Sequence, residues 1–440
     1  MPRRIIPVAS GKGGVGKTTF AVNFALALSR TAPTVLVDLD TGTSGVRHTL
    51  QVPIERDLYH VKRRGVPLAE CITRLDPAHD PQGEYPDFGF IAGPRHFIED
   101  LANPDAEFRR RLAGEISRLP AEYVVLDLRA GLDANVLEFL PFTNSGILVF
   151  TPQHPTATLA AADIVKAILF RSLRILFARG SSFYRRPGME RYHDFVNGLL
   201  DRVEDVYDPS LPSLDAFLAE LGEAFGEHPI IEVIADTLDS FRVHYVLNMF
   251  NGVEESFNAA VVPLVESLAA QVSARLNLTH LGWIVHDERI HQANCAGYPI
   301  LLDRRGRGRV APQPVDRVMA ELEALASSLH GLRRSAPRRP PPAARPAPMP
   351  NPAPPPAADL LSGQLETLRA MFSDRRKDTV RENFAYIVYR ALNLMAPPMA
   401  PTELGATLLA APEQVERWFI RRQGSEAAMA PEGASAPPPR

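Results

Sequence analysis

The stretch "ASGKGGVGKTTFAVNFALAL" (residues 9–28) decides the fold. It overlaps the end of "RIIPVAS", a short apolar run rich in branched residues, as is typical of a buried parallel strand. Within it, Phe20, Phe24 and Leu28 recur at helical spacing, so a helix is predicted to begin near Lys17. Glycines between a strand and a helix N-terminus let backbone N–H groups point at an anion. The sequence therefore predicts a phosphate-binding loop.

The loop from Gly11 to Thr18 matches the pattern GxxxxGK[ST] in full. In that pattern Lys17 is expected beside the β- and γ-phosphates, and the Thr18 hydroxyl is expected to bind Mg²⁺. Lys12 is a second lysine that the ordinary pattern does not require. The predicted nucleotide-binding residues here are Gly11, Gly13, Gly14, Val15, Gly16, Lys17, Thr18 and Thr19.

Two more apolar runs carry carboxylates where each predicted strand ends. "PTVLVDLD" (33–40) ends in Asp38 and Asp40, and "EYVVLDLRAG" contains Asp127, the expected acidic partner of a Mg²⁺ shell. Open parallel sheets place their chemistry at this edge. Either Asp38 or Asp40 alone has an alternative interpretation as the cap of a following turn. The pattern predicts a doubly wound α/β domain with a mainly parallel sheet.

Composition bounds the class of protein. The 440 residues are too many for one ordinary core, and 48 basic against 51 acidic residues give no argument for or against nucleic acid. Two cysteines, Cys71 and Cys295, exclude a disulfide framework and fit a reducing compartment. No uncharged apolar run approaches the roughly 20 residues that cross a bilayer. A soluble, cytoplasmic protein is expected.

Proline divides the chain. Residues 335–358 hold eleven prolines and no aromatic residue, so a stiff, extended spacer is expected there. The predicted organisation is a nucleotide-binding domain over 1–330, a Pro-rich linker over 331–358, a helical module over 359–424 and a disordered tail over 425–440.

Six segments together resemble the MinD/ParA family of P-loop ATPases, which includes the flagellar-number regulator FlhG. They are, in the family's order, the two-lysine loop "KGGVGKTT", "VDLDTGTSG" (switch I), "VVLDLRAGLD" (Walker B and switch II), "ILVFTPQHPTATLAAADIVKAI", "YVLNMFN" and "LGWIVHDERIHQANCAGYPIL". The resemblance covers most of the first 330 residues. It implies an ATPase that uses ATP and Mg²⁺, with Asn248 reading adenine and Asp287 near the base or ribose.

The resemblance also gives the carboxylates and Lys12 roles. Lys12 would reach across a face-to-face homodimer to the partner's nucleotide, and its alternative is a solvated loop lysine. Asp40 would position the attacking water, and Asp38 would assist the Mg²⁺ shell formed by Thr18 and Asp127. The predicted catalytic residues are thus Lys12, Lys17 and Asp40.

The chain departs from the family pattern at three places. Ser44 and Gly45 stand where an asparagine is common in switch I, and Val285-His286 replaces the usual proline before Asp287. Arg129 lies in switch II. Its alternative roles are a surface salt bridge and a contact to the γ-phosphate or to a carboxylate of the partner.

Two segments exceed the family pattern. Residues of about 170–240 show helical spacing, with arginines interleaved in an apolar piece; a packed helical insertion, a partner-binding surface and a lipid contact are the alternatives. Residues 359–424 suggest three helices, the last with a helix–turn–helix-like rhythm. Their weak positive excess leaves protein docking and DNA contact both open. No C-terminal membrane anchor of the MinD kind is recognisable, so peripheral membrane contact stays only a possibility.

The function expected from the resemblance is a Mg²⁺-dependent ATPase that dimerises around ATP and acts as a spatial or regulatory switch. A protein effector would stimulate its slow turnover. A ParA-like partition ATPase that binds DNA and a nonhydrolytic nucleotide-binding scaffold are the alternatives. The regulated structure and the activating partner are not predicted.

Overall fold

The fold is seen in a computed structural model that describes residues 4–40, 44–132, 146–179, 181, 183–185, 188–205, 211–303, 363, 365–366, 369 and 380–395. One eight-stranded sheet forms its centre, in the order β3-β4-β2-β5-β1-β6-β7-β8. The strands are β1 (Arg4–Ala9), β2 (Thr34–Asp38), β3 (Thr73–Arg74), β4 (Phe88–Ile91), β5 (Tyr123–Asp127), β6 (Ile147–Phe150), β7 (Arg242–Phe250) and β8 (Asn277–Val285). All neighbours are parallel except β3 and β4, which are antiparallel.

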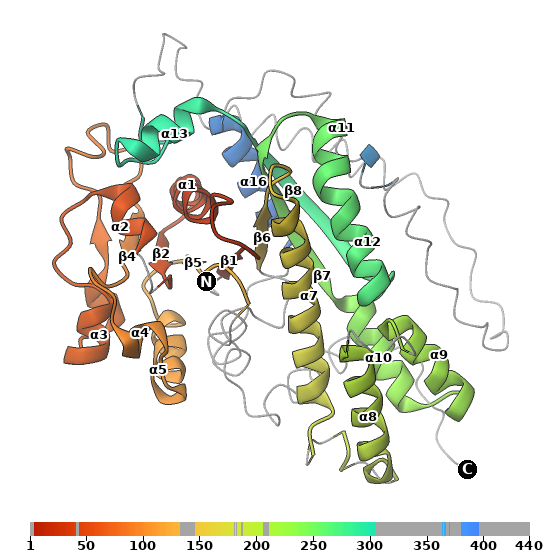
Figure 1. Ribbon diagram of the computed structural model, residues 1–440. Helices are drawn as coiled ribbons and strands as arrows, with labels where there is room; N and C mark the ends of the chain where they lie inside the picture. The colour runs from red at the N-terminus through yellow and green to blue at the C-terminus, as the bar shows by residue number, and fades with distance from the viewer. Residues whose placement is uncertain are drawn as a thin grey trace, which may run out of the picture.

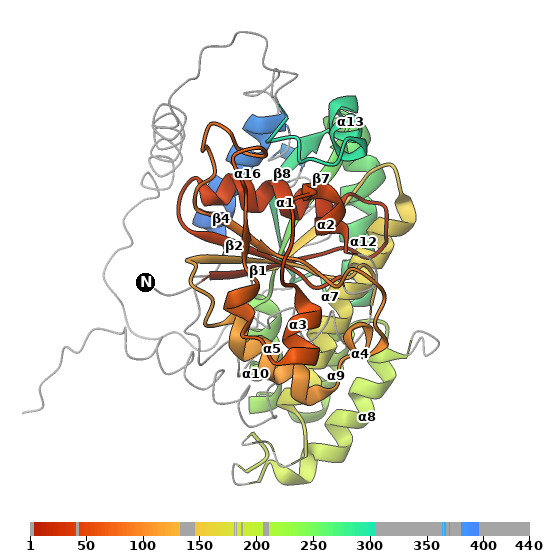
Figure 2. The same cartoon turned by 90° about the vertical axis from the view of Figure 1, so that its left-hand side faces the viewer.

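Helices cover both faces of this sheet, as Figures 1 and 2 show. Their bounds are α1 (Lys17–Ser29), α2 (Gly45–Leu50), α3 (Leu58–Arg64), α4 (Glu99–Ala102), α5 (Ala106–Ile116), α7 (Pro155–Leu176), α8 (His193–Glu204), α9 (Leu214–Phe225), α10 (Pro229–Ser240), α11 (Val253–Ser256), α12 (Val262–Gln271), α13 (Glu288–Cys295) and α16 (Val380–Leu394). Short 3₁₀ turns occupy Leu68–Cys71 and Glu190–Tyr192, and a π-helical segment spans Phe257–Val261. The predicted doubly wound, mainly parallel α/β fold is confirmed.

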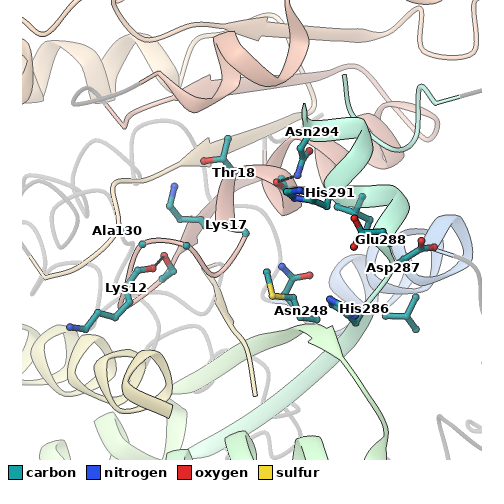
Figure 3. A pocket seen from close by; sticks show the side chains of 18 of the residues that line it. Lys12, Lys17, Thr18, Ala130, Asn248, His286, Asp287, Glu288, His291 and Asn294 are labelled. Carbon is teal, nitrogen blue, oxygen red and sulfur yellow. Dashed lines mark hydrogen bonds between the residues drawn. The ribbon is translucent and has the colours of Figure 1, made fainter. Parts of the chain in front are cut away.

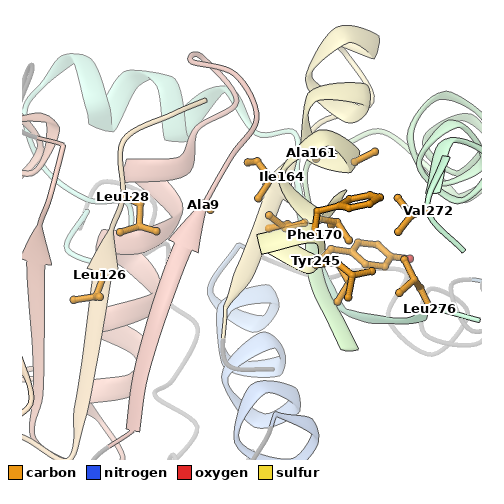
Figure 4. Packing of buried hydrophobic residues seen from close by; sticks show 14 of the residues in the cluster. Ala9, Leu126, Leu128, Ala161, Ile164, Phe170, Tyr245, Val272 and Leu276 are labelled. Atoms are coloured by element: carbon orange, nitrogen blue, oxygen red, sulfur yellow. The ribbon is translucent and has the colours of Figure 1, made fainter. Parts of the chain in front are cut away.

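The core divides into two layers, one on each face of the sheet. Helices α1, α2, α13 and α16 pack on one face, and α3, α5, α7 and α12 pack on the other. Since both faces are covered, the central strands are buried along nearly their whole length, which explains their continuous apolar runs. Figure 4 shows the second layer, where Phe170 of α7 lies beside Tyr245 of β7.

Strands β3 and β4 were not predicted from the sequence. They lie in the sequence between β2 and β5, the two strands that end in the predicted carboxylates. Strand β3 has only two residues, and β4 has four. Runs this short carry little periodicity, so pattern alone does not reveal them. The sheet nevertheless places β2 next to β5, which brings their carboxylates together.

The stretch predicted as a helical insertion contains the end of α7 followed by α8, α9 and α10. These helices lie beyond the end of α7, away from α1 (Figure 1). Arg174 of α7 bridges Asp201 and Glu204 of α8, and Asp215 of α9 accepts hydrogen bonds from Ser273 Oγ (2.7 Å) and the Ala274 amide (2.8 Å). The helices are thus tied to α7 and to the segment before β8; the limits of the insertion stay a prediction.

Helix α16 packs on the main sheet, although the sequence assigns its residues to a separate C-terminal module. It contacts β8 and α1, and Val380, Phe384, Ile387 and Ala391 are buried in the first core layer. A proline-rich spacer argues for separation along the chain, but it does not fix where the next helix docks. The helix–turn–helix-like segment at 401–423 lies outside the described residues, as do the linker and the tail, and the predicted domain limits stay a prediction.

In the part of the chain that the structure describes, every helix is too short or too polar to span a membrane.

Candidate functional site

A cavity of about 400 Å³ lies at the carboxyl ends of the central strands, between the glycine loop and the segment that joins β8 to α13. Figure 3 shows the two sides: Lys12, Lys17 and Thr18 on one, and Asn248, His286 and Asp287 on the other. The lining residues are Ser10, Lys12, Gly13, Gly14, Gly16, Lys17, Thr18, Thr19, Asp40, Ala130, Asn248, Met249, Val285, His286, Asp287, Glu288, Ile290, His291 and Asn294. Most of the predicted site residues therefore meet in one place.

The loop before α1 depends on glycine at specific positions. Gly14 and Gly16 have φ of 84° and 80°, a conformation that favours glycine. A Cβ on Gly11 would lie 2.3 Å from the backbone carbonyl carbon of Ala160 in α7. The loop is thereby free to present backbone N–H groups at the N-terminus of α1, the arrangement that binds phosphate.

Lys17, Thr18 and Asp127 form a buried cluster at the phosphate end of the cavity. Lys17 Nζ lies 2.5 Å from Asp127 Oδ1, and Thr18 Oγ1 donates to Asp127 Oδ2 at 2.7 Å. Lys17 and Asp127 are both buried. Helix α1 supplies Lys17 and Thr18, and β5 supplies Asp127. The glycine loop and the strand-end carboxylate, which are far apart in the sequence, therefore lie side by side.

Asp38 lies directly beside this cluster, because β2 and β5 pair with Asp38 opposite Asp127. Its carboxylate accepts from Ser44 Oγ (2.7 Å) and from the Asp40 amide (3.1 Å). Burial, reinforced by the charge of Asp127, raises the pKa of Asp38 to about 7. Two buried carboxylates beside a single lysine leave this end short of positive charge.

This donor set fits a magnesium ion. Thr18, Asp38 and Asp127 offer hydroxyl and carboxylate oxygens close together, which are the ligands that Mg²⁺ prefers. A divalent cation would also supply the positive charge that the two buried carboxylates lack.

The two lysines of the loop differ in environment. Lys17 is buried, whereas Lys12 is exposed, and Figure 3 shows the Lys12 side chain extending away from Lys17. Asp40 is half-buried and lines the same cavity. Arg129 of switch II is exposed.

The other end of the cavity is built from β7, β8 and α13. The Asn248 side chain is buried and donates from Nδ2 to the Val15 carbonyl at 2.8 Å, which ties β7 to the phosphate loop. The pairing of β7 with β8 shifts register here, and Met249 has a positive φ of 55°. Asp287 caps α13 and pairs with Arg289, which lowers the pKa of Asp287.

Three contacts at the site were not predicted from the sequence. Ser44, noted only as a departure from the family pattern, holds Asp38, and a Cβ on Gly45 would lie 2.9 Å from Thr18 Cγ2. Asn294 donates to Thr19 Oγ1 at 3.1 Å, so α13 also contacts α1. Asn294 lies seven residues after Asp287, two helical turns along α13, and that spacing was the available signal.

A glycine loop between a strand and a helix, a buried lysine and strand-end carboxylates define the class of P-loop nucleotide-binding proteins. Residues 6–300 match the family model described as the CobQ/CobB/MinD/ParA nucleotide binding domain. The chain belongs to this family, within its MinD/ParA branch.

Curated relatives match over shorter stretches. The chain is 26% identical over 208 residues to a putative septum site-determining protein MinD of Nephroselmis olivacea (46% of this chain, 69% of the relative). It is 30% identical over 151 residues to MinD of Synechocystis (34% and 54%), and 27% over 165 residues to the flagellum site-determining protein YlxH of Helicobacter pylori (37% and 52%). The matches span about half the length of most of these relatives.

Solved structures are similar over a larger share of the chain. The septum site-determining protein MinD of Pyrococcus horikoshii, complexed with Mg-ADP, is 15% identical and matches with a TM-score of 0.41, covering 70% of this chain and 91% of that one.

Proposed function

We propose that this chain is a Mg²⁺-dependent ATPase that forms a face-to-face homodimer around ATP and acts as a switch that binds protein partners differently in its two states. The observation that carries the proposal is the cluster of Lys17, Thr18 and Asp127 beneath a loop whose second lysine, Lys12, is exposed. Such a loop has one lysine for its own phosphates and one available to another chain.

At the phosphate end, Lys17 would bind the β- and γ-phosphates, and Thr18, Asp38 and Asp127 would hold the ion. A bound Mg²⁺ would supply positive charge against the negative charge that develops on the phosphates. Asp40 orients the attacking water, in keeping with its place at the cavity wall. Asn248 and Asp287 hold the adenosine part at the other end.

Lys12 completes the site of the partner subunit. A positive group supplied in trans contributes about 10³–10⁵ in the rate of phosphoryl transfer. The same contact makes ATP part of the dimer interface, so hydrolysis separates the two chains.

The relatives named above are described as septum or flagellum site-determining proteins. That similarity supports the proposal of a positioning or number-control switch, which we take to be cytoplasmic and stimulated in its hydrolysis by a protein effector. We further propose the domain organisation predicted from the sequence, with DNA contact through the C-terminal module and lipid contact through the helical insertion as the alternatives to protein docking.

The experiment is phosphate release from ATP by the full chain, with Mg²⁺ and with excess EDTA. We expect hydrolysis only with Mg²⁺, and a loss of about 100-fold or more in Asp40→Ala, because a positioned general base or water-orienting group contributes about 10²–10⁴. Lys12→Ala should lose hydrolysis as well, because the partner's site lacks the cation supplied in trans, and Lys166→Ala, which changes a lysine on α7, is its matched control. Hydrolysis that persists unchanged in Asp40→Ala would overturn the role assigned to Asp40, whereas ATP binding without any phosphate release by the unaltered chain would favour a nonhydrolytic scaffold.

A further inference from the structure

Helix α16 packs against elements from both sides of the cavity, although it lies about 80 residues beyond the part of the chain that the family model matches. Figure 2 shows it on the same face of the sheet as α1 and α13. Its residues contact α1, which carries the phosphate loop, and β8, which leads into the β8–α13 turn (residues 285–288). All four residues of that turn line the cavity.

The contact with the turn is a part-buried hydrogen bond. Asn383 is only 2% exposed, and its Oδ1 accepts from the Val285 amide at 3.1 Å. Strand β8 is at the edge of the sheet, so one side of it has no neighbouring strand among the described residues. The next amide, of His286, donates to Phe250 of β7 at 3.0 Å. The turn is therefore fixed by β7 on one side and by α16 on the other.

The contact with α1 is mainly apolar. The Phe384 ring stacks on Phe20, with centroids 6.0 Å apart, and Phe20 follows Thr18 by two residues. Arg381 donates to the Leu301 carbonyl, and the Leu301 amide donates to Asn23 of α1 at 3.1 Å.

Strand β8 is shaped to let the helix approach closely. Gly282 has a positive φ of 154°, and a Cβ there would lie 2.6 Å from Ile387 of α16. Further along, Arg390 donates to the His280 carbonyl at 2.7 Å. Helix α16 and strand β8 thus contact each other at three successive points: Asn383 with Val285, Ile387 with Gly282, and Arg390 with His280. The other two contacts hold Asn383 in place beside Val285.

We propose that Asn383 is a positioning residue for the nucleotide: through the Val285 amide, α16 sets the β8–α13 turn and so determines how tightly the cavity holds the base and ribose. The inference rests on the proposed function, since it takes the cavity as a nucleotide site. Because coupling between two equilibria is reciprocal, a bound nucleotide must in turn stabilise α16 in its docked position.

The test compares Asn383→Ala with Asn393→Ala in the full chain. Asn393 is exposed on the same helix, and its side chain donates to the Tyr389 carbonyl of that helix, so it is a matched control. We expect Asn383→Ala to bind ATP and ADP about fivefold more weakly, since the Val285 amide loses its hydrogen-bond partner. Its affinity for inorganic tripolyphosphate, which needs only the phosphate end, should not change, and Asn393→Ala should match the unaltered chain with all three.

Equal ATP affinity in Asn383→Ala and the unaltered chain would overturn the inference, as would an equal loss with tripolyphosphate. If the unaltered chain binds neither ATP nor ADP, the proposed function itself fails. Should Asn383→Ala not fold, hydrogen exchange of the unaltered chain decides. ADP must then slow exchange in α16 as well as in residues 285–288, and protection of the turn without α16 would contradict the coupling.

Discussion

The two ends of the cavity are built differently. The phosphate end takes its groups from a loop and from strands at the centre of the sheet, and its charged side chains are buried against one another. The other end is formed at the sheet edge by β8 and α13, where Asp287 pairs with a largely exposed Arg289, and it is supported by a helix from far along the chain. The phosphate end is thus fixed by the centre of the fold, and the other end is fixed by contacts at the sheet edge.

The largest expected effect is at the phosphate end. We expect Lys17→Ala to lower ATP hydrolysis by about 10³-fold or more, because the γ-phosphate loses a preorganised cation. It should also lower the free energy of unfolding by about 3–5 kcal/mol, since Asp127 remains buried without its partner. Phosphate release and urea unfolding measure the two losses, with Lys166→Ala as control. Unchanged stability would mean that the phosphate end is less tightly paired than its geometry implies.

The edge of the sheet should be more sensitive to acid. Burial lowers the pKa of His244 to about 4 and, aided by the charge of Arg390, that of His280 well below its usual value. Between pH 6.5 and about 4 the unfolded chain therefore takes up protons that the folded chain does not, and stability falls as the pH falls. The loss should be roughly 1.4 kcal/mol per pH unit for each histidine.

Urea unfolding from pH 7 to 4.5 checks this. The double variant His244→Gln/His280→Gln cannot take up these protons, so its stability should fall less steeply than that of the unaltered chain. Parallel curves for the two proteins would show that the histidines do not cause the acid sensitivity.

A smaller effect is expected where the two ends meet. Asn248→Ala removes the hydrogen bond to the Val15 carbonyl and should weaken ATP binding about fivefold. Asn251→Ala, an exposed asparagine just after β7, is the control and should leave the affinity unchanged. Titration calorimetry with ATP measures both, and equal affinities in the two variants would separate the phosphate loop from β7.

The smallest effect is expected at Asp287. Asparagine caps a helix about as well as aspartate, and the lost ion pair with Arg289 is largely exposed, so Asp287→Asn should change ATP affinity by less than about threefold. The same calorimetric titration checks it. A loss of tenfold or more would show that Asp287 holds the adenosine through its charge, which asparagine does not replace.

The placement of the side chains at the phosphate end could be predicted from the sequence, because each lies in a short motif whose position in a doubly wound fold is fixed; their roles stay predictions. Lys17 and Thr18 lie in one loop, and Asp38 and Asp127 end strands that the doubly wound fold brings together. Ser44 was seen only as a departure, since nothing in its neighbourhood indicates that it holds Asp38.

The other end is predicted less completely. Asn248 and Asp287 follow from the family resemblance, but the contact between Asn383 and Val285 joins residues 98 positions apart across a proline-rich segment. Amphipathic spacing predicts that residues 381–395 form a helix without indicating the surface that covers it. Such docking is decided by shape, here by the space that Gly282 leaves for Ile387.

The central claim is that ATP joins two chains through Lys12. The most direct measurement is the solution mass by light scattering, with and without Mg-ATP, of Asp40→Ala and of Asp40→Ala/Lys12→Ala. The account predicts that the mass of Asp40→Ala doubles with Mg-ATP and that the loss of Lys12 abolishes this doubling. A mass that stays monomeric in both variants, or one that doubles equally in both, would contradict it.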